Sequence, residues 1–248
     1  MLTIGSKVKI KDRDGNFEIV DFEIKDDEIF YILNNGDNVK ENMLEVLFEP
    51  KMELQNVELK YKDKFTNLYH LKYKNLNKEE KIYELLSRKE LKNNNSVGKH
   101  IDAITMIIKH KSLNKYLLLR EYRLAVNTFV YNLVAGLIDE GETPIEACIR
   151  EVWEETNLSI TKDNIVYSLD NSYSSVGLSD EQIQTFFIEV DGDVKLKTDG
   201  NPNECIYPRF YSLDEIRYLL KYEMFTSRTQ MLFEMICLQE ENKSFFKN

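Results

Sequence analysis

The chain has 248 residues, of which 42% are hydrophobic and 31% charged, and its formal net charge is −10. This composition is typical of a globular protein that buries a core. The acidic balance argues against a general nucleic-acid binder, which needs a basic surface, whereas a small phosphate-bearing substrate stays compatible because a bound metal reverses the local field.

The spacing of cysteines and histidines indicates neither a disulfide framework nor a zinc site. The three cysteines show no CxxC spacing, and the three histidines lie in separate segments. Unpatterned cysteines are typical of a reducing compartment. The N-terminal stretch MLTIGSKVKI lacks the apolar core of a signal peptide, and no apolar run approaches the roughly 20 residues of a membrane span. We therefore expect a cytoplasmic location and no membrane partner.

Residues 1–48 are predicted to form a small all-β module. Lys7–Ile10, Phe17–Phe22 and Glu28–Leu33 read as short strands. Turn signals lie between them at 14–16 and 25–27, and Asn35-Gly36 follows the third strand. Val39–Val46 ends the unit. The module resembles the small SH3-like barrels that begin with a G-x-x-V-x-I strand. Such barrels bind peptides or nucleic acid, but we favour an appendage for stability or docking.

Residues 52–96 are predicted to be a β-rich lead-in to the rest of the chain. Val57–Tyr61 and Leu68–Tyr73 alternate in the manner of strands. Lys78–Leu91 fits both a helix with an apolar face and a strand, and both alternatives stay open. The polar run Asn93–Ser96 predicts a loop or hinge.

Apolar density rises from residue 101 onward. Ile101–Ile108 and Tyr116–Leu119 predict two buried strands joined by a loop. A third apolar run, Phe129–Val134, leads directly to Gly136.

The C-terminal third mixes strands and helices. Ile165–Leu169 and Gln182–Val190 read as strands, with the loop Asn171–Glu181 between them. A Ser-x-x-Glu capping box at Ser212 predicts a helix that ends near Lys221. The last predicted helix, 227–239, carries an apolar stripe that we interpret as core packing, formed by Met231, Leu232, Met235, Ile236 and Leu238. This mixture, with antiparallel-looking hairpins, predicts an α+β or mixed α/β fold.

A helix dense with glutamate follows the glycine loop at Gly136. Glu151, Glu154 and Glu155 have the spacing i, i+3 and i+4, which places them on one helix face. Like charges on one face repel each other, and a divalent cation removes that repulsion because hard cations take oxygen ligands. The stretch therefore predicts a metal site.

The start of this helix is well marked in the sequence. Thr143 can cap it, Pro144 suits the first helical position, and Glu146 completes a capping box. Arg150 lies four residues from both Glu146 and Glu154, so it can pair with either and hold Glu154 in place. An apolar face toward a sheet is expected from Ile145, Cys148, Ile149 and Val152.

The whole stretch resembles the Nudix hydrolase signature, G-x5-E-x7-R-E-U-x-E-E-x-G-U, in which U is a bulky aliphatic residue. The second glycine is replaced by Asn157, which suits the left-handed conformation that ends many helices. The matching positions are Gly136, Glu142, Arg150, Glu151, Val152, Glu154, Glu155 and Leu158.

The resemblance implies an α+β class of fold. Residues 97–248 are expected to form a Nudix domain with a mixed sheet between helices (α/β/α), which follows the small all-β N-terminal domain in the sequence. It implies metal-dependent hydrolysis of a nucleoside diphosphate linked to another group, with Mg²⁺, or alternatively Mn²⁺, as the cofactor. The implied metal ligands are Glu151, Glu155, Glu154 and the carbonyl of Ala135. Glu154 and Arg150 also count among the implied catalytic residues, and Glu142 is placed at the edge of the site as a substrate contact.

The preceding flank, LLLREYRLAVNTFVYNLVAGLIDEGE, is similar to ADP-ribose and nucleoside-diphosphate-sugar pyrophosphatases. In that group an arginine in a Q-x-R or E-x-R context reaches the substrate phosphates. Arg123 is the matching residue, and Arg120 is the weaker alternative. Asn132 stands where this group often has a glutamate.

A second flank, Tyr173–Glu181, resembles the S-P-G-x-S-x-E loop of the same group, with Val176 in place of proline. That loop supplies a further acidic group near the metals, as ligand or general base. Glu181 is the residue we favour, with Asp180 as the alternative.

In this group the segment before the catalytic domain helps to form a homodimer and to bind the nucleoside base. Residues 52–96 occupy that place. The candidates for stacking on a base are Phe65, Tyr69 and Tyr73, and Arg88 is a candidate to contact a phosphate or a base. Plain packing or surface exposure is the alternative for each.

The leading hypothesis is a Mg²⁺-dependent enzyme that cleaves ADP-ribose or a related nucleotide sugar into a nucleoside monophosphate and a sugar phosphate. The alternatives are a Nudix hydrolase for dinucleoside polyphosphates, NADH or capped RNA, and a non-catalytic Nudix-fold ligand sensor. The expected partner is a small molecule rather than nucleic acid, and the partner of the N-terminal barrel is not specified.

Overall fold

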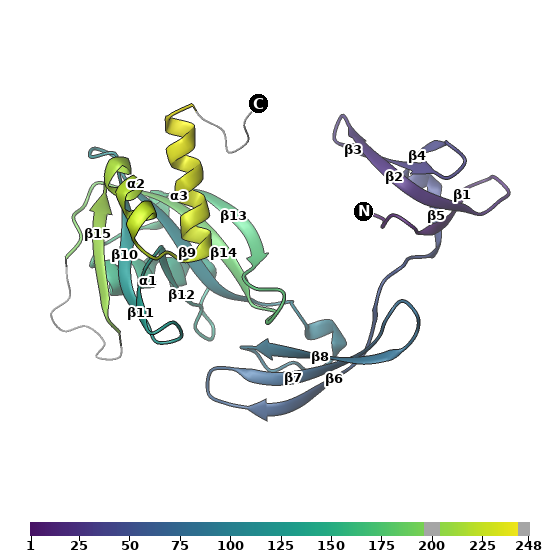
Figure 1. Cartoon of the computed structure of the whole chain (residues 1–248), viewed down its shortest axis with the longest axis horizontal. Coiled ribbons are helices and arrows are strands. Elements are labelled where there is room, and N and C mark those ends of the chain that lie inside the picture. Colours follow the sequence, from purple (N-terminus) through teal and green to yellow (C-terminus); the bar gives the residue numbers. More distant parts are fainter. Residues whose placement is uncertain (196–203, 243–248) are drawn as a thin grey trace. The chain divides into compact units, whose positions relative to one another are not determined.

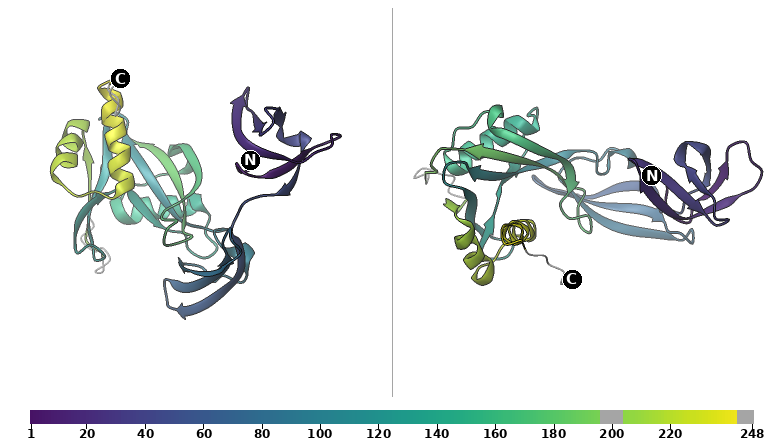
Figure 2. Two further views of the ribbon diagram at one scale, coloured as in Figure 1. Left: turned by 45° about the vertical axis from the view of Figure 1, so that its right-hand side comes forward. Right: turned by 90° about the horizontal axis from the view of Figure 1, so that it is seen from above.

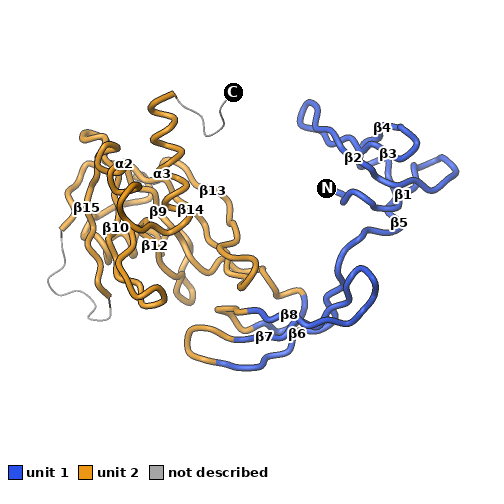
Figure 3. The backbone as a smooth tube through the Cα atoms, in the orientation of Figure 1, with its two compact units in different colours: residues 1–62, 68–85, 91–94 blue, residues 63–67, 86–90, 95–248 orange. Residues whose placement is uncertain are grey.

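The computed structural model describes residues 1–195 and 204–242 (Figure 1). The described chain forms two compact units (Figure 3). The first unit comprises residues 1–62, 68–85 and 91–94, and the second comprises 63–67, 86–90 and the chain from residue 95. Strands dominate the first unit, and strands and helices build the second, which confirms the predicted mixed α+β class with an all-β N-terminal region.

The N-terminal part of the first unit is a five-stranded sheet of order β4-β3-β2-β1-β5. Its strands are β1 (Lys7–Ile10), β2 (Phe17–Lys25), β3 (Glu28–Leu33), β4 (Asn38–Lys40) and β5 (Leu44–Phe48). A hydrophobic cluster of its own is centred on Val8, Ile19, Tyr31, Leu33 and Leu44.

The prediction of one segment at Val39–Val46 is wrong. A 3₁₀ turn at Glu41–Met43 divides it into β4 and β5. The physical reason is that the two halves serve different neighbours, since β4 pairs with β3 whereas β5 pairs with β1.

A three-stranded sheet of order β6-β7-β8 follows, formed by β6 (Glu53–Lys62), β7 (Asn67–Lys74) and β8 (Glu80–Ser87). The segment 78–91, for which helix and strand both stayed open, therefore contains a strand. A turn decides between them: Asn75 N donates to Glu79 O over 3.0 Å and Lys78 N donates to Asn75 O over 2.9 Å. This turn returns the chain antiparallel to β7.

The second unit is built on a mixed seven-stranded sheet. Its path is β11-β10-β9-β14-β13, with β12 paired to β9 and β15 paired to β10. β14 runs parallel to β9, whereas the other pairings are antiparallel. The strands are β9 (Ile101–His110), β10 (Lys115–Arg123), β11 (Thr128–Asn132), β12 (Val134–Leu137), β13 (Ile165–Tyr173), β14 (Gln182–Val190) and β15 (Ile206–Tyr211).

Strands β9 and β10 are held together at one end. The described residues pair them through Lys115–His110 and Tyr116–Lys109, and the two strands then separate. Beyond this point β10 pairs with β11 and β15, whereas β9 pairs with β12 and β14. The apolar run Phe129–Val134 is therefore divided between β11 and β12, because the chain changes partner at Leu133. β15 was not predicted, since Pro208 interrupts the strand pattern in its sequence.

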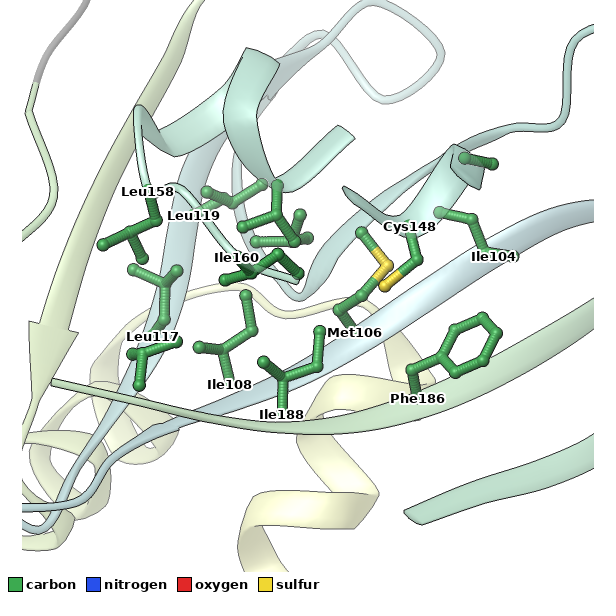
Figure 4. Packing of buried hydrophobic residues seen from close by; sticks show 14 of the residues in the cluster. Ile104, Met106, Ile108, Leu117, Leu119, Cys148, Leu158, Ile160, Phe186 and Ile188 are labelled. Carbon is green, nitrogen blue, oxygen red and sulfur yellow. The ribbon is translucent and has the colours of Figure 1, made fainter. Parts of the chain in front are cut away.

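Helices cover both faces of this sheet (Figure 2). α1 (Pro144–Thr156) packs on one face, and α2 (Leu213–Tyr222) and α3 (Ser227–Glu240) pack on the other. Alternating side chains of β9 and β10 point to opposite faces. The α1 side includes Ile104, Met106, Ile108, Cys148 and Phe186 (Figure 4), and the opposite side includes Ile107, Leu118, Tyr131, Ile216 and Phe233.

The buried face of α3 confirms only part of the predicted stripe, in which Leu232 and Ile236 pack against the core. Thr229, Phe233 and Cys237 are buried, whereas Met231 and Met235 are 66% and 55% exposed. Because α3 lies on the surface of the sheet, it buries one narrow row of side chains at a spacing of four. No helix in the described ranges is long and apolar enough to cross a bilayer.

Substitution of Phe233 by alanine tests this face. Phe233 is fully buried between α3 and the sheet, so F233A is expected to lower the free energy of unfolding by about 3–5 kcal/mol. M235A on the exposed side of the same helix is the control, expected to change it by less than about 0.5 kcal/mol. Urea denaturation of both variants measures the difference, and equal effects would contradict the assignment.

Candidate active site

The glutamate helix α1 begins as the sequence predicts. Thr143 Oγ1 accepts from Glu146 N over 3.3 Å, and the Glu146 carboxylate accepts from Thr143 N over 2.8 Å. Pro144 opens the helix, and Asn157 closes it in the left-handed conformation with φ of 58°. The capping box engages the Glu146 carboxylate, so Arg150 pairs elsewhere.

The buried face of α1 is formed by Ala147, Cys148, Val152 and Thr156. Ile149 is partly buried against the same cluster. Ile145 was predicted to belong to this face, but it is 44% exposed. It lies in the first turn, where the helix has not yet reached the sheet.

The position of the Glu151 carboxylate against β12 depends on glycine at position 136. A Cβ atom at Gly136 would lie 2.0 Å from Cδ of Glu151. Such a contact is impossible, so the absent side chain is the condition under which the Glu151 carboxylate rests against the strand. The first glycine of the motif therefore places a carboxylate.

Arg150 holds three carboxylates. Its Nε and Nη2 atoms donate to the two oxygens of Glu142 over 2.9 and 2.8 Å. Nη1 donates to Glu151 over 2.7 Å and to Glu154 over 3.2 Å. Nη2 also donates to the carbonyl of Leu137 over 2.9 Å. The hydrogen bonds from Arg150 lower the pKa of Glu142. The same hydrogen bonds are the main reason why the pKa of Arg150 is raised.

The three helical glutamates lie in different surroundings. The Glu154 side chain is 51% exposed and that of Glu151 is 14% exposed. Glu155 lies deeper, where its carboxylate accepts from Ala135 N over 3.3 Å. Burial, and then the charges of Glu151 and Glu121, raise the pKa of Glu155 well above its usual range. Among the described residues no ion pair is formed by Glu155, and the charge of Arg123 lowers its pKa by less than burial raises it.

The donor set fits a hard divalent cation. Carboxylate oxygens are the ligands that Mg²⁺ takes, and crowded, buried carboxylates are stabilised by a cation between them. Across the described residues, no three histidine, cysteine, aspartate or glutamate side chains converge on a ready-made metal cluster. Glu151 turns toward Arg150 instead. The chemistry of the residues thus fits the implied metal, although the carboxylates are not gathered around one point.

A cavity of about 740 Å³ lies beside this helix. Within the described part of its wall, six carboxylates outnumber three guanidinium groups. An anionic ligand would therefore meet an acidic surface, and added cations would reverse that field. The charged residues of the wall are Glu121, Glu151, Glu154, Glu155, Glu181, Glu204, Arg88, Arg123 and Arg228.

Arg88 and Glu181, predicted from separate parts of the sequence, meet at this cavity as an ion pair. Ser174 Oγ donates to the second oxygen of Glu181 over 2.8 Å. The end of β8 brings Arg88 there, because Leu86 N donates to Leu178 O over 3.0 Å. The alternative residue, Asp180, accepts from Gly98 N over 3.0 Å and is not part of the cavity wall.

Arg123 lines the cavity, with its Nε 2.8 Å from Oε1 of the buried Glu121. Asn132 Nδ2 donates to the same oxygen over 2.8 Å. The sequence reading missed Glu121 as a site residue. The sequence did hold a signal for it: Glu121 is a charged residue within a buried strand. It lies two residues before Arg123, so both side chains point to the same face of the sheet. Arg228 was missed because it comes from α3, far along the chain.

Seven predicted residues, counting the alternatives, lie outside the described cavity wall: Phe65, Tyr69, Tyr73, Glu142, Arg120, Asp180 and Arg150. Phe65 is 63% exposed, and Lys64 Nζ lies 4.8 Å from its ring centroid. Glu142 is engaged with Arg150 rather than facing the cavity. Arg120, the weaker alternative to Arg123, packs its guanidinium 4.0 Å from the ring centroid of Phe129. The remaining predicted residues, Ala135, Glu151, Glu154, Glu155, Arg123, Arg88 and Glu181, line the cavity together.

Substitution of Gly136 by alanine tests the contact between β12 and α1. The added methyl group displaces the Glu151 carboxylate and breaks its hydrogen bond with Arg150, so G136A is expected to lower the free energy of unfolding by about 1 kcal/mol. G177A is the control, because a Cβ at Gly177 meets nothing within 4 Å. Thermal unfolding compares the two variants, and a melting temperature unchanged in both would contradict the tight approach.

The sequence profile of the NUDIX domain matches residues 99–232, which is more than half of the chain. A Caenorhabditis elegans protein named nudix hydrolase 2 is 32% identical over 104 residues, 41% of this chain and 46% of that protein. The NAD-capped RNA hydrolase of Saccharomyces cerevisiae is 33% identical over 66 residues, 27% of this chain and 17% of the yeast protein. These two matches thus cover less than half of each relative.

The ADP-ribose pyrophosphatase of Bacillus subtilis is 22% identical over 145 residues, 58% of this chain and 76% of that enzyme. The crystal structure of an ADP compounds hydrolase superposes with a TM-score of 0.53 at 15% identity, covering 78% of this chain and 97% of that one. This structural likeness concerns the fold alone. Because the family match spans the glutamate helix and most of the sheet, the chain belongs to the Nudix family.

Proposed function

We propose that the protein hydrolyses the pyrophosphate bond of a nucleoside diphosphate sugar, with ADP-ribose as the favoured substrate, to a nucleoside monophosphate and a sugar phosphate. One observation carries this proposal: the cavity brings the carboxylates of α1 together with Arg88 and Arg123. Carboxylates suit a divalent cation, and guanidinium groups suit phosphate oxygens. The similarity to the Bacillus subtilis ADP-ribose pyrophosphatase supports the choice of substrate.

Glu151, Glu154, Glu155 and the carbonyl of Ala135 would hold Mg²⁺, or Mn²⁺. A bound cation offsets phosphate charge and lowers the pKa of bound water. Arg150 is a positioning residue in this proposal, because its guanidinium fixes the carboxylates of Glu151 and Glu154 from outside the cavity wall.

Arg123 and Arg88 would donate to the oxygens of the diphosphate. Glu181 would accept the proton of the attacking water, since it lies in the cavity wall and has a carboxylate oriented by Ser174 and Arg88. A phosphate that draws Arg88 away from this pair would leave the Glu181 carboxylate ready to accept the proton.

The rest of the organisation is also part of the proposal. Residues 1–48 would be an SH3-like docking module, 52–96 a region for dimerisation and substrate binding, and 97–248 the catalytic domain of a homodimer. The cysteines Cys148, Cys205 and Cys237 are free thiols, which agrees with a reducing, cytoplasmic location.

The experiment that tests the substrate is a panel of nucleoside diphosphate derivatives with Mg²⁺ or Mn²⁺, scored for release of monophosphate. ADP-ribose and related nucleotide sugars are expected to be cleaved fastest. Faster cleavage of dinucleoside polyphosphates, NADH or NAD-capped RNA would show that the proposed substrate is wrong, while pyrophosphate hydrolysis would remain the reaction. Binding without any cleavage would favour a ligand sensor.

Replacement of Glu155 by glutamine is expected to lower turnover by orders of magnitude while the fold is kept, because an amide is a poor ligand for the cation that the carboxylate would hold. E140Q is the control, since Glu140 is exposed and lies outside the cavity wall. Steady-state kinetics and circular dichroism measure activity and fold. Unchanged activity of E155Q would overturn the metal assignment.

Deletion of residues 1–48 is expected to leave hydrolysis intact. This segment has its own hydrophobic cluster, and none of its residues belongs to the described cavity wall. The kcat and KM of the shortened protein give the measurement, with circular dichroism to verify its fold. Loss of activity in a folded deletion variant would show that the N-terminal module belongs to the active site.

A further inference from the structure

Asn132, at the end of β11, uses both ends of its amide. Nδ2 donates to Glu121 Oε1 over 2.8 Å. Oδ1 accepts from the hydroxyl groups of Thr226 and Thr229 over 2.8 and 3.1 Å. A carboxylate can only accept, so the amide must present Nδ2 to Glu121 and leaves Oδ1 for the hydroxyl groups. The amide therefore joins the acidic wall of the cavity to the start of α3.

Glu121 passes this constraint on to Arg123. The Glu121 side chain is 4% exposed, and the same oxygen that accepts from Asn132 lies 2.8 Å from Arg123 Nε. The Arg123 side chain is 52% exposed and reaches the cavity wall. A buried carboxylate thus fixes the inner edge of a guanidinium whose outer edge is free to meet a ligand. Fixing a flexible side chain beforehand reduces the entropy lost on binding.

The start of α3 is anchored to β11 by its backbone as well. Tyr131 N donates to Met224 O over 2.7 Å, and Thr226 N donates to Tyr131 O over 3.1 Å. Thr226 occupies the N-cap position of α3 but makes no side-chain cap hydrogen bond. A threonine at this position normally caps its own helix. Here its hydroxyl donates to Asn132 instead. The helix end therefore loses the stabilisation of a side-chain cap, and the chain gains a hydrogen bond between α3 and the cavity wall.

We propose that Glu121 and Asn132 are positioning residues that orient Arg123 toward the diphosphate. Thr226 and Thr229 hold Asn132 in place from the start of α3, and the chain of contacts from these two threonines through Asn132 and Glu121 to Arg123 is here called the relay. The inference rests on the proposed function, because it assigns Arg123 to the substrate phosphates. The first turn of α3 also carries Arg228 into the cavity wall. The relay therefore orients Arg123 directly, and it holds in place the helical turn that carries Arg228.

The relay requires an amide at position 132. Alanine removes both hydrogen bonds and leaves the Glu121 carboxylate with one donor fewer in a buried site. Arg123 then loses its fixed orientation, so the affinity for substrate falls while the reacting groups on α1 stay in place. N132A is accordingly expected to raise KM by about tenfold with little change in kcat.

A double-mutant cycle with Arg123 separates positioning from general damage. N132A, R123A and N132A/R123A are compared by kinetics on the member of the panel that the wild-type protein cleaves fastest. The expected result is that N132A raises KM in the wild-type background but not in R123A, because Asn132 acts through Arg123. An equal rise in both backgrounds would overturn the inference.

Arg120 provides the matched control background. It lies on the same strand and packs on Phe129 rather than facing the cavity, so the effect of N132A on KM is expected to persist in R120A. Should N132A fail to fold, T229V replaces it, since valine keeps the shape of threonine and removes one hydroxyl donor. T229V is expected to raise KM in the same background-dependent manner, by a smaller factor, and an unchanged KM would overturn the relay.

Binding of ADP in the presence of Mg²⁺, measured by calorimetry, separates this inference from the proposed function. If the wild-type protein binds ADP but cleaves no member of the panel, the proposed reaction fails, and the same cycle read in Kd still tests the relay. Cleavage by the wild-type protein with equal effects of N132A in both backgrounds overturns the relay alone. Absence of both cleavage and ADP binding overturns both.

Discussion

The arrangement of carboxylates at the candidate site depends on the close contact between Gly136 of β12 and the Glu151 side chain of α1. A side chain at this position would occupy the space of the Glu151 carboxylate. The glycine therefore lets a charged helix face lie directly against a strand. Charged groups buried in this way are unstable without partners. The surrounding sequence supplies those partners, and this requirement explains why the conspicuous residues of the motif lie so close together in the chain.

Arg150 provides most of that compensation. It binds Glu142, Glu151 and Glu154 together with the carbonyl of Leu137, so four acceptors share one guanidinium. Glu155 is outside its reach and has the amide of Ala135 instead. Within the described residues, Arg150 pairs with the carboxylates on one side of the helix, whereas the partly buried Glu155 carboxylate forms no ion pair. A proposed cation would act on the Glu155 carboxylate.

Local patterns predicted the parts of the fold that depend on neighbours in the sequence. The capping box of α1, the left-handed residue at Asn157 and the glutamate spacing were all readable because each involves residues a few positions apart. Contacts between distant segments could not be read. The change of partner at Leu133, the strand containing Pro208 and the bonds from Thr226 to Asn132 all depend on which strand or helix lies alongside. Part of the buried face of α3 was misjudged for the same reason.

The early separation of β9 and β10 divides the sheet into two leaves. One leaf, with β9, β12 and β14, carries the glutamate helix, and the other, with β10, β11 and β15, carries Arg123 and is tied to α3. Under the proposed roles, bond cleavage belongs to the first leaf and substrate recognition to the second. A mutation in the leaf that carries Arg123 can therefore change which substrate is preferred, while the carboxylates carried by the other leaf stay unchanged. New substrate preferences can thus evolve in this fold without loss of the hydrolytic residues.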